Sequence, residues 1–246
     1  MQRCRAVLVG LLVFCCAHVS QSIAATLRVG FGASKPPYVY EHESRGLEYD
    51  LVAAALREGG DELRPYYAPA ERLHRMFKQG ELDAMATTGS ASDVGAFYSD
   101  SYIEYQNVVV SLASRDIVLQ RIADLDALSV SAFQRARYML GAEYAAMVRR
   151  NPAYREEPRQ IIRSLLLYAG RVDAVVADER IFNAFNPLIA GQVDVAQPIT
   201  IHRLFAPTPY SVGFVDSAAR DRFNTGLAAL RASGEYARIV ARYAAQ

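Results

Sequence analysis

The chain has 246 residues, with 27 lysines and arginines against 26 aspartates and glutamates, and a formal net charge of +1. Its three cysteines, Cys4, Cys15 and Cys16, all lie at the N-terminus, so the rest of the chain offers no disulfide, thiolate nucleophile or cysteine metal site. The balanced charge suggests no binding to nucleic acid or to an anionic membrane surface, and the length suits one large domain or two small ones.

The first 24 residues have the three-part pattern of a secretory signal peptide: Arg3 and Arg5, an apolar run over 6–17, and small residues up to Ala24. The apolar run is too short for a comfortable membrane span. We expect cleavage after Ala24, which leaves 222 residues with 25 basic and 26 acidic side chains in the periplasm. The alternatives are a lipoprotein that begins at one of the two adjacent cysteines and an uncleaved anchor.

Strands and helices alternate in the first half. Apolar runs and helical spacing predict strands at 26–32, 63–69 and 82–88 and helices at 49–60 and 70–80. Between the first strand and the first helix, Pro36 and Pro37 force an extended loop. Within that segment we assign Glu48 to shaping the first helix. The order predicts a parallel sheet with helical crossover connections.

The second half repeats this arrangement. It predicts strands at 128–133 and 171–178, helices at 134–151 and 157–170, and two amphipathic helices after 217 that are separated at Gly234. Two long extended runs, 105–114 and 209–216, lie between the halves and near the end. The charged stretch REEPR at 155–159 predicts a solvated helix end.

One phrase occurs twice, as GELDAMATT at 80–88 and as GRVDAVVAD at 170–178, with Gly, Asp and Ala at matching places. Each copy connects a predicted helix to a predicted strand, with the glycine as the helix cap. Because ligands of open parallel sheets bind beyond the carboxyl ends of the strands, Thr88 and Asp178 are predicted to face one cleft between two similar lobes. Chance similarity together with helix capping is the alternative explanation.

In the order and spacing of several motifs, the chain resembles the extracytoplasmic solute-binding proteins of family 3, the binding components of amino-acid-type ABC importers. The resemblance runs through LRVGFGASKPPYVYEHESRGLEYDLVAAAL, GELDAMATT, YSDSY, GRVDAVVAD and the closing PYSVGFV…RFNTGLAALRASGEYARIVARY. It implies an α/β fold of the type II periplasmic-binding-protein kind, a Venus flytrap with two lobes joined by two hinge strands.

The resemblance also implies domains and partners. Lobe 1 is expected to contain residues 25–110 and 208–246, and lobe 2 residues 111–207. The expected ligand is a small polar solute, amino-acid-like or a related amine or organic acid. The expected protein partner is an inner-membrane ABC permease, or a signalling receptor if the protein is a sensor. We expect a monomer without a cofactor or metal.

The chain departs from the family at one position of the ligand site. Members that bind amino acids usually carry an arginine about ten residues before the tyrosine that matches Tyr102, and this arginine holds the α-carboxylate. Ser92 occupies that position, with Asp93 beside it, and no lysine or arginine occurs between Lys78 and Arg115. The usual carboxylate clamp is therefore missing or rebuilt.

The candidate ligand site combines the strand ends with the family resemblance. Asp178 matches the residue that holds the amino group of the ligand, or caps the next helix instead, and Tyr38 matches a ring that stacks on the ligand or packs within a lobe. For an anionic ligand, Arg72 and Arg135 are the candidate cations, and solvent exposure is the alternative for both. The full predicted set is Tyr38, Arg72, Thr87, Thr88, Ser92, Phe133, Gln134, Arg135 and Asp178.

Two further functions remain open. A binding module of this kind can report its ligand to a signalling partner, and cyclohexadienyl dehydratases are similar to the family, in which case Asp93, Glu104 or Asp178 would be the acid or base. The sequence has no established catalytic or phosphate-binding motif. Its histidines beyond the leader, His42, His74 and His202, are scattered without metal spacing and are predicted to be surface residues.

Overall fold

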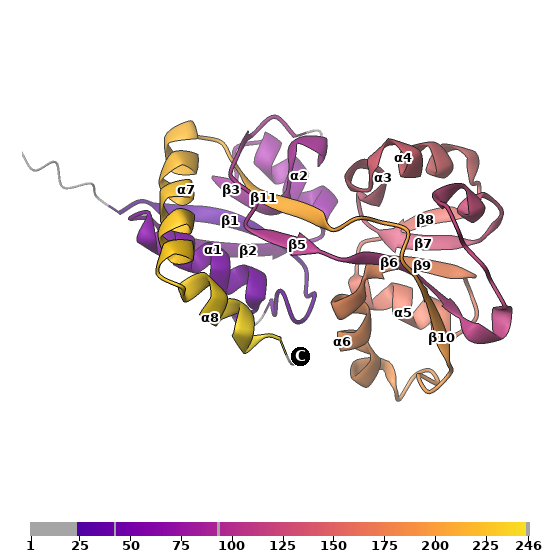
Figure 1. The fold of residues 1–246 in the computed structure, drawn as a ribbon. Coiled ribbons are helices and arrows are strands. Elements are labelled where there is room, and N and C mark those ends of the chain that lie inside the picture. The colour runs from indigo at the N-terminus through magenta and orange to yellow at the C-terminus, as the bar shows by residue number, and fades with distance from the viewer. Residues whose placement is uncertain (1–23, 42, 93, 245–246) are drawn as a thin grey trace, which may run out of the picture.

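Two β-sheets, each with helices packed on both faces, lie side by side in the computed structural model (Figure 1). The structure describes residues 24–41, 43–92 and 94–244, so the expected signal peptide lies outside the described residues apart from Ala24. We call the part built on the first sheet, residues 24–105 and 208–244, lobe 1, and the part built on the second sheet, residues 107–202, lobe 2.

The sheet of lobe 1 has the strand order β2-β1-β3-β11-β4, and β5 pairs with β11. The first three strands are parallel, as predicted, and β11 runs antiparallel to β3. The strands are β1 (Thr26–Gly32), β2 (Glu62–Ala68), β3 (Ala84–Thr88), β4 (Phe97–Tyr98), β5 (Ile103–Tyr105) and β11 (Thr208–Phe214), and the helices are α1 (Leu47–Glu58), α2 (Ala70–Lys78), α7 (Ser217–Ala232) and α8 (Glu235–Arg242).

The sheet of lobe 2 has the order β10-β6-β9-β7-β8. Here β7 is parallel to β8 and β9, while β6 is antiparallel to β9 and β10. The strands are β6 (Asn107–Leu112), β7 (Val130–Phe133), β8 (Tyr154–Glu157), β9 (Ala174–Asp178) and β10 (Ile199–His202), and the helices are α3 (Ala136–Met139), α4 (Gly141–Arg150), α5 (Gln160–Tyr168) and α6 (Glu179–Ile189).

Two connections join the lobes. The chain leaves the first sheet at Tyr105 and enters the second at Asn107, and it returns between His202 and Thr208. Each connection is short and leads from a strand of one sheet to a strand of the other, which is the usual arrangement of a hinge between two lobes.

The lobes also touch away from the hinge. In lobe 1, α1, α7 and α8 cover one face of the sheet and α2 covers the other. In lobe 2, α5 and α6 cover one face and α4 the other. Ile181 and Phe185 of α6 belong to the buried cluster of lobe 1 rather than to their own lobe, so α6 packs against lobe 1.

The glycines of the repeated phrase end helices in the same way. Gly80 follows α2 with φ of 72°, and Gly170 follows α5 with φ of 65°. In both copies, the N–H of the residue after the glycine donates to the carbonyl five residues earlier at 2.9 Å. This bond and the positive φ define a Schellman cap, which confirms that each copy is a helix-to-strand turn.

The aspartates of the repeat also have equivalent structural roles. Asp83 accepts the backbone N–H of Arg28 at 2.8 Å, and Asp173 accepts that of Ser129 at 2.9 Å. Arg28 also donates hydrogen bonds to the Asp83 carboxylate and to the carbonyl of the capping glycine. In lobe 2, Arg115 donates the two corresponding hydrogen bonds. The repeat therefore connects each helix end to the start of a strand, and these aspartates take no part in the cleft.

Two predicted elements differ in the structure. The helix predicted over 134–151 is divided into α3 and α4, because Gly141, at the start of α4, adopts a φ of 88°. The charged stretch predicted as a helix end begins within β8, an edge strand that pairs only with β7. Among the described residues, no helix is both long enough and apolar enough to cross a membrane.

Candidate ligand-binding site

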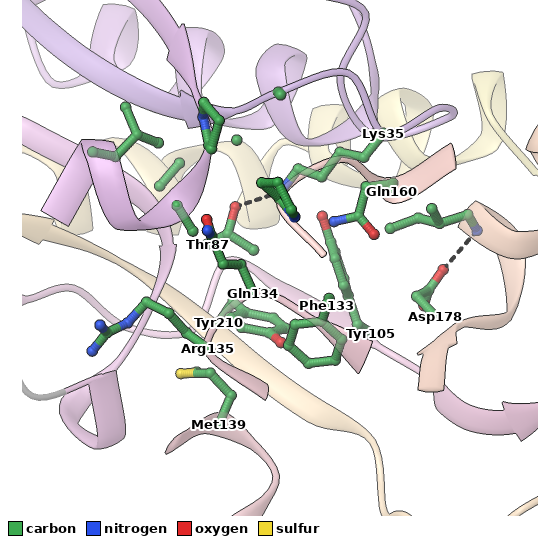
Figure 2. A pocket seen from close by; sticks show the side chains of 18 of the residues that line it. Lys35, Thr87, Tyr105, Phe133, Gln134, Arg135, Met139, Gln160, Asp178 and Tyr210 are labelled. Atoms are coloured by element: carbon green, nitrogen blue, oxygen red, sulfur yellow. Dashed lines mark hydrogen bonds between the residues drawn. The ribbon is translucent and has the colours of Figure 1, made fainter. Parts of the chain in front are cut away.

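A cavity lies between the lobes, at the ends of β1 and β3 on one side and of β7 and β9 on the other (Figure 2). Its interior holds about 90 Å³, and it is partly open to solvent. Because open α/β sheets bind ligands at the carboxyl ends of their strands, this cavity is the candidate binding site.

Lys35 and Thr87 form part of the lobe 1 wall. Lys35 lies in the loop after β1, is 4% exposed, and donates from Nζ to Thr87 Oγ1 at 2.6 Å (Figure 2). Thr87 has a φ of 52°, in the left-handed region, which costs a residue with a side chain on the order of 1–2 kcal/mol. Its N–H donates to the hydroxyl of Tyr102 at 3.1 Å, and this bond holds the strained strand end in place.

A buried ion pair neutralises Lys35. Its Nζ lies 2.7 Å from Oε2 of Glu48, a residue of α1 that has no exposed surface. Removing either partner would leave the other as an unpaired buried charge, which is strongly unfavourable. Lys35 therefore brings a hydrogen-bond donor to the cavity but little net charge.

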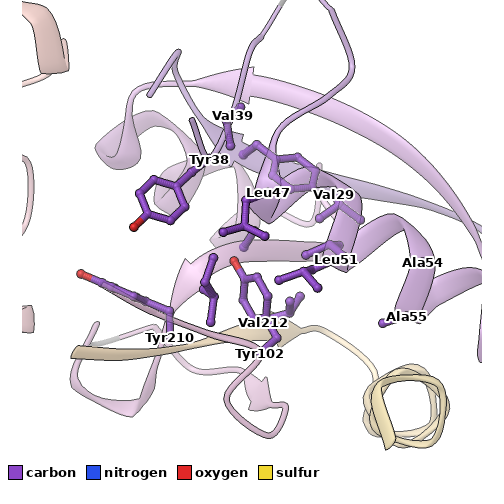
Figure 3. Packing of buried hydrophobic residues seen from close by; sticks show 14 of the residues in the cluster. Val29, Tyr38, Val39, Leu47, Leu51, Ala54, Ala55, Tyr102, Tyr210 and Val212 are labelled. Carbon is purple, nitrogen blue, oxygen red and sulfur yellow. The ribbon is translucent and has the colours of Figure 1, made fainter. Parts of the chain in front are cut away.

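Hydroxyl groups complete the surroundings of Glu48. Tyr102 donates to Oε1 at 2.7 Å, Tyr105 donates to Oε2 at 2.5 Å, and the Thr87 hydroxyl donates to Oε1. Burial opposes ionisation of Glu48, but the charge of Lys35 and these hydrogen bonds outweigh it and lower its pKa. Burial raises the pKa of both tyrosines, so they remain donors. Figure 3 shows Tyr102 among the buried apolar side chains of lobe 1.

The lobe 2 wall begins where β7 ends, at Phe133, Gln134 and Arg135. Arg135 has a φ of 72°, and its side chain reaches lobe 1, where it pairs with Glu71 at 3.1 Å and contacts the carbonyl of Ser92. The side-chain oxygen of Gln134 accepts the N–H of Glu71 at 3.0 Å. These contacts bridge the two lobes beside the cavity.

Asp178 ends β9 at the cavity and also caps α6. Its Oδ1 accepts the N–H groups of Arg180 and Ile181 at 3.0 and 3.1 Å, and its Oδ2 accepts the N–H of Gln106 at 3.0 Å. Burial raises the pKa of Asp178, although these hydrogen bonds act in the opposite direction. The carboxylate is therefore both a structural cap, which was one alternative from the sequence, and a part of the cavity wall.

Tyr38 lies between the lobes. Its ring stacks on that of Tyr105 with 4.2 Å between centroids, and its hydroxyl donates to Oδ2 of Asp178 at 3.3 Å. The side chain is 2% exposed and forms no part of the cavity lining, whereas Tyr105 does. The aromatic ring at the cavity is thus Tyr105, with Tyr38 as the ring behind it.

Most of the predicted site residues meet at this cavity. They come from strand ends in both lobes, which agrees with the reasoning from the repeated phrase. Their contact with a ligand stays a prediction. The predicted residues that line the cavity are Thr87, Ser92, Phe133, Gln134, Arg135 and Asp178.

Arg72 and Thr88 do not take the predicted positions. Arg72 is exposed and donates to the hydroxyl of Tyr66 at 2.9 Å, on the surface of lobe 1. Thr88 has no exposed surface and donates to the hydroxyl of Ser92 at 2.7 Å. Thr88 therefore lies behind the cavity wall, and its neighbour Thr87 takes the cavity side.

Sequence reasoning missed Lys35, His74 and Gln160, which also line the cavity. His74 and His202 are each 8% exposed, so the prediction of surface histidines is wrong for both, while His42 lies outside the described residues. Burial, and then the nearby charges of Arg135 and Lys78, lower the pKa of His74 to about 3. The spacing of His74 three residues before apolar Phe77 was a signal that it faces inward.

Solved structures with the same fold cover nearly the whole chain. An ancestral arginine-binding protein bound to arginine has a TM-score of 0.75 and 20% identity, over 90% of this chain and 99% of that one. A histidine kinase sensor domain with similarity to periplasmic binding proteins has a TM-score of 0.76 and 19% identity, over 90% and 97%. The arginine-, lysine-, histidine-binding protein ArtJ from Geobacillus stearothermophilus has a TM-score of 0.73 and 17% identity, over 90% and 96%.

The two lobes with the cavity between them have the type II periplasmic-binding-protein fold. Residues 27–246 match the model of the bacterial extracellular solute-binding proteins, family 3, and the chain belongs to that family. No curated protein matches the sequence.

Proposed function

We propose that this protein captures a small polar, amino-acid-like solute between its lobes and delivers it to an inner-membrane ABC permease. The supporting observation is the interlobe cavity at the strand ends, which has charged side chains on both walls. The ligand class also draws on similar structures, which are described with arginine, glutamine and L-glutamate as ligands. In such proteins, closure of the lobes on a solute creates the surface that a membrane partner recognises.

The direct test is binding by the purified protein, expressed from the full chain with its own leader. Thermal unfolding would be followed with each common L-amino acid, with polyamines and with dicarboxylic acids. A ligand at about a hundred times its Kd stabilises the folded state by roughly 2.7 kcal/mol, which corresponds to a rise of about 5–10 °C in Tm for a chain of this size. A panel in which no compound raises Tm would contradict the proposal.

Delivery in the periplasm also requires export and a free N-terminus. We propose that the leader is removed after Ala24. N-terminal sequencing or intact mass of the secreted protein is then expected to show Ala25 as the first residue. A lipid-modified Cys15 or Cys16, or a mass that includes the leader, would instead place the protein at a membrane.

Sensing is the second candidate function, because one similar structure is a histidine kinase sensor domain. Growth separates the two candidates: a transport protein is needed for uptake of its ligand, while a sensor is needed for a transcriptional response to it. Another similar structure is described as an ancestral amino-acid-binding protein that is a precursor of cyclohexadienyl dehydratase. Its likeness concerns the fold alone, and we propose binding rather than catalysis.

A further inference from the structure

Arg163 is buried inside lobe 2 and forms no ion pair with another described residue. Its side chain is 1% exposed. Within the part of the chain that the structure describes, its Nε and Nη1 have no hydrogen-bond partner, and its Nη2 donates only to the side chain of Gln160. An uncompensated buried charge is costly, so this guanidinium marks a place where an anion would be stabilised.

Arg163 contacts two side chains that line the cavity. The guanidinium carbon lies 5.9 Å from the centre of the Phe133 ring, and Gln160 is its hydrogen-bond partner. Burial lowers the pKa of Arg163 to about 10, so it is still charged at neutral pH. Figure 2 shows Gln160 and Phe133 among the side chains around the cavity. A rotation of the flexible Gln160 side chain would bring the guanidinium into contact with a solute.

The N-terminus of α5 lies at the same place. Pro158 and Gln160, at the start of this nine-residue helix, both line the cavity. The N-cap residue Arg159 makes no side-chain capping bond, and the first turn of α5 contains no acidic residue. Side chains of a helix lean toward its N-terminus, so Arg163 points back to this uncapped end. The positive end of the helix dipole and the guanidinium therefore both stabilise an anion at the same position.

The other cations of the cavity are already paired. Lys35 is neutralised by Glu48, and Arg135 pairs with Glu71. The family position of the carboxylate-clamping arginine is occupied by Ser92. Among the described residues, Arg163 contacts Phe133 and Gln160 of the cavity wall and forms no ion pair with an acidic side chain.

The acidic groups of lobe 2 restrict the orientation of a solute. Glu157, which pairs with Arg155 at 3.2 Å, and Asp178 both line the cavity, and both carboxylates act on the charge of Arg163. They would repel a second anion but attract an amino group. A solute with one acidic and one amino group satisfies both requirements if its acid faces α5 and its amine faces Asp178.

We propose that lobe 2 holds the carboxylate of an amino-acid-like solute, on Arg163, Gln160 and the N-terminus of α5, in place of an arginine clamp in lobe 1. This inference rests on the proposed function. It requires the solute to have a carboxylate, which the missing arginine clamp would otherwise hold, and predicts that binding depends on this carboxylate.

The test compares wild type with Arg163→Met, which keeps the length of the side chain and removes its charge. Binding is measured by calorimetry with L-arginine, L-glutamine and L-glutamate, and with their α-carboxamides. We expect each amino acid that binds wild type to bind Arg163→Met with roughly tenfold or more lower affinity. The α-carboxamide of that amino acid should bind wild type about as weakly as the amino acid itself binds the variant. Arg150→Met is the matched control, because Arg150 pairs with Asp126 on the surface of lobe 2. It should bind as wild type does.

The ligand-free variants separate a binding role from a structural one. Because Arg163 has no charged partner to lose, the Tm of Arg163→Met is expected to equal or exceed that of wild type. A clear drop in Tm, or a failure to fold, would show that Arg163 serves the fold and would overturn the inference. Gln160→Leu, at the cavity surface, should also weaken binding several-fold without lowering Tm.

The outcomes distinguish this inference from the proposed function. If an amino acid binds wild type and Arg163→Met equally well, or if its carboxamide binds as tightly, the carboxylate is not held by lobe 2. The proposed function then stands and the inference falls. If only polyamines of the wider panel bind wild type, the inference falls, and if no compound of that panel binds, both fall together.

Discussion

Single residues determine the lobe 1 wall, and the Lys35–Glu48 pair is the clearest case. Both side chains are buried and 2.7 Å apart. We expect Lys35→Met and Glu48→Gln each to lower the free energy of unfolding by about 3–5 kcal/mol, because each leaves an unpaired or poorly paired polar group inside the lobe. The double variant should lose less than the sum. Urea unfolding of the four proteins measures this coupling.

The exposed pair Arg150–Asp126, with side chains 52% and 35% exposed, is the control for that cycle. Removing either of its partners should change the free energy of unfolding by about 0–1 kcal/mol. Equal losses at the exposed and the buried pair would show that burial does not govern the energy of the Lys35–Glu48 contact.

His74 makes stability depend on pH. Burial lowers its pKa in the folded protein to about 3, whereas an unfolded histidine titrates near 6.5. Between these values the unfolded state binds the extra proton, so stability is full above pH 6.5 and falls as the pH decreases, by up to about 1.4 kcal/mol per pH unit. Urea unfolding between pH 7 and pH 5 should show a shallower loss for His74→Gln than for wild type. Parallel curves would contradict this assignment.

At the scale of elements, the capping glycines make a matched comparison possible. Gly80 has φ of 72° and open space where the methyl group of an alanine would lie, so Gly80→Ala tests backbone strain alone. We expect a loss of about 1–2 kcal/mol in the free energy of unfolding. Gly191 also has open space but no positive φ, and Gly191→Ala should be neutral or slightly stabilising. A neutral Gly80→Ala would mean that the helix end can shift to another cap.

The elements that could be predicted are those with a regular apolar pattern. Strand β1 and helix α2 follow their predicted ranges closely because their buried residues recur at the period of the element. Strand β8 was missed because its sequence YREE has no apolar alternation, and it forms by pairing with β7 at the sheet edge. Helix α6 was missed as an element, although Asp178 was recognised as a possible cap for it.

The site could be predicted only in part, for a related reason. Strand ends identified Thr87, Phe133 and Asp178 because topology brings such ends to one cleft. Lys35 and Arg163 carry no signal of this kind. Their burial depends on side chains from distant segments, such as Glu48 for the lysine, and no local pattern encodes that meeting.

At the scale of the whole molecule, the two lobes are held together by a small number of polar contacts in addition to α6. Arg135 of lobe 2 reaches Glu71 and the carbonyl of Ser92 in lobe 1, and Tyr38 of lobe 1 donates to Asp178 of lobe 2. Each of these contacts joins groups on opposite sides of the hinge, so opening of the lobes must break them. Their strength therefore contributes to the lifetime of the closed state.

Glu71→Gln tests this contribution at a residue that does not itself line the cavity. Glu71 pairs with Arg135 but does not line the cavity, and its side chain is 52% exposed. The lost ion pair is worth up to about 1 kcal/mol, so dissociation of a bound solute should become up to about fivefold faster, with little change in association. Stopped-flow release measures both rates. Asp126→Asn is the control, because Asp126 pairs with Arg150 on the surface of lobe 2. If it accelerates release as much as Glu71→Gln does, the contact between the lobes does not set the lifetime of the closed state.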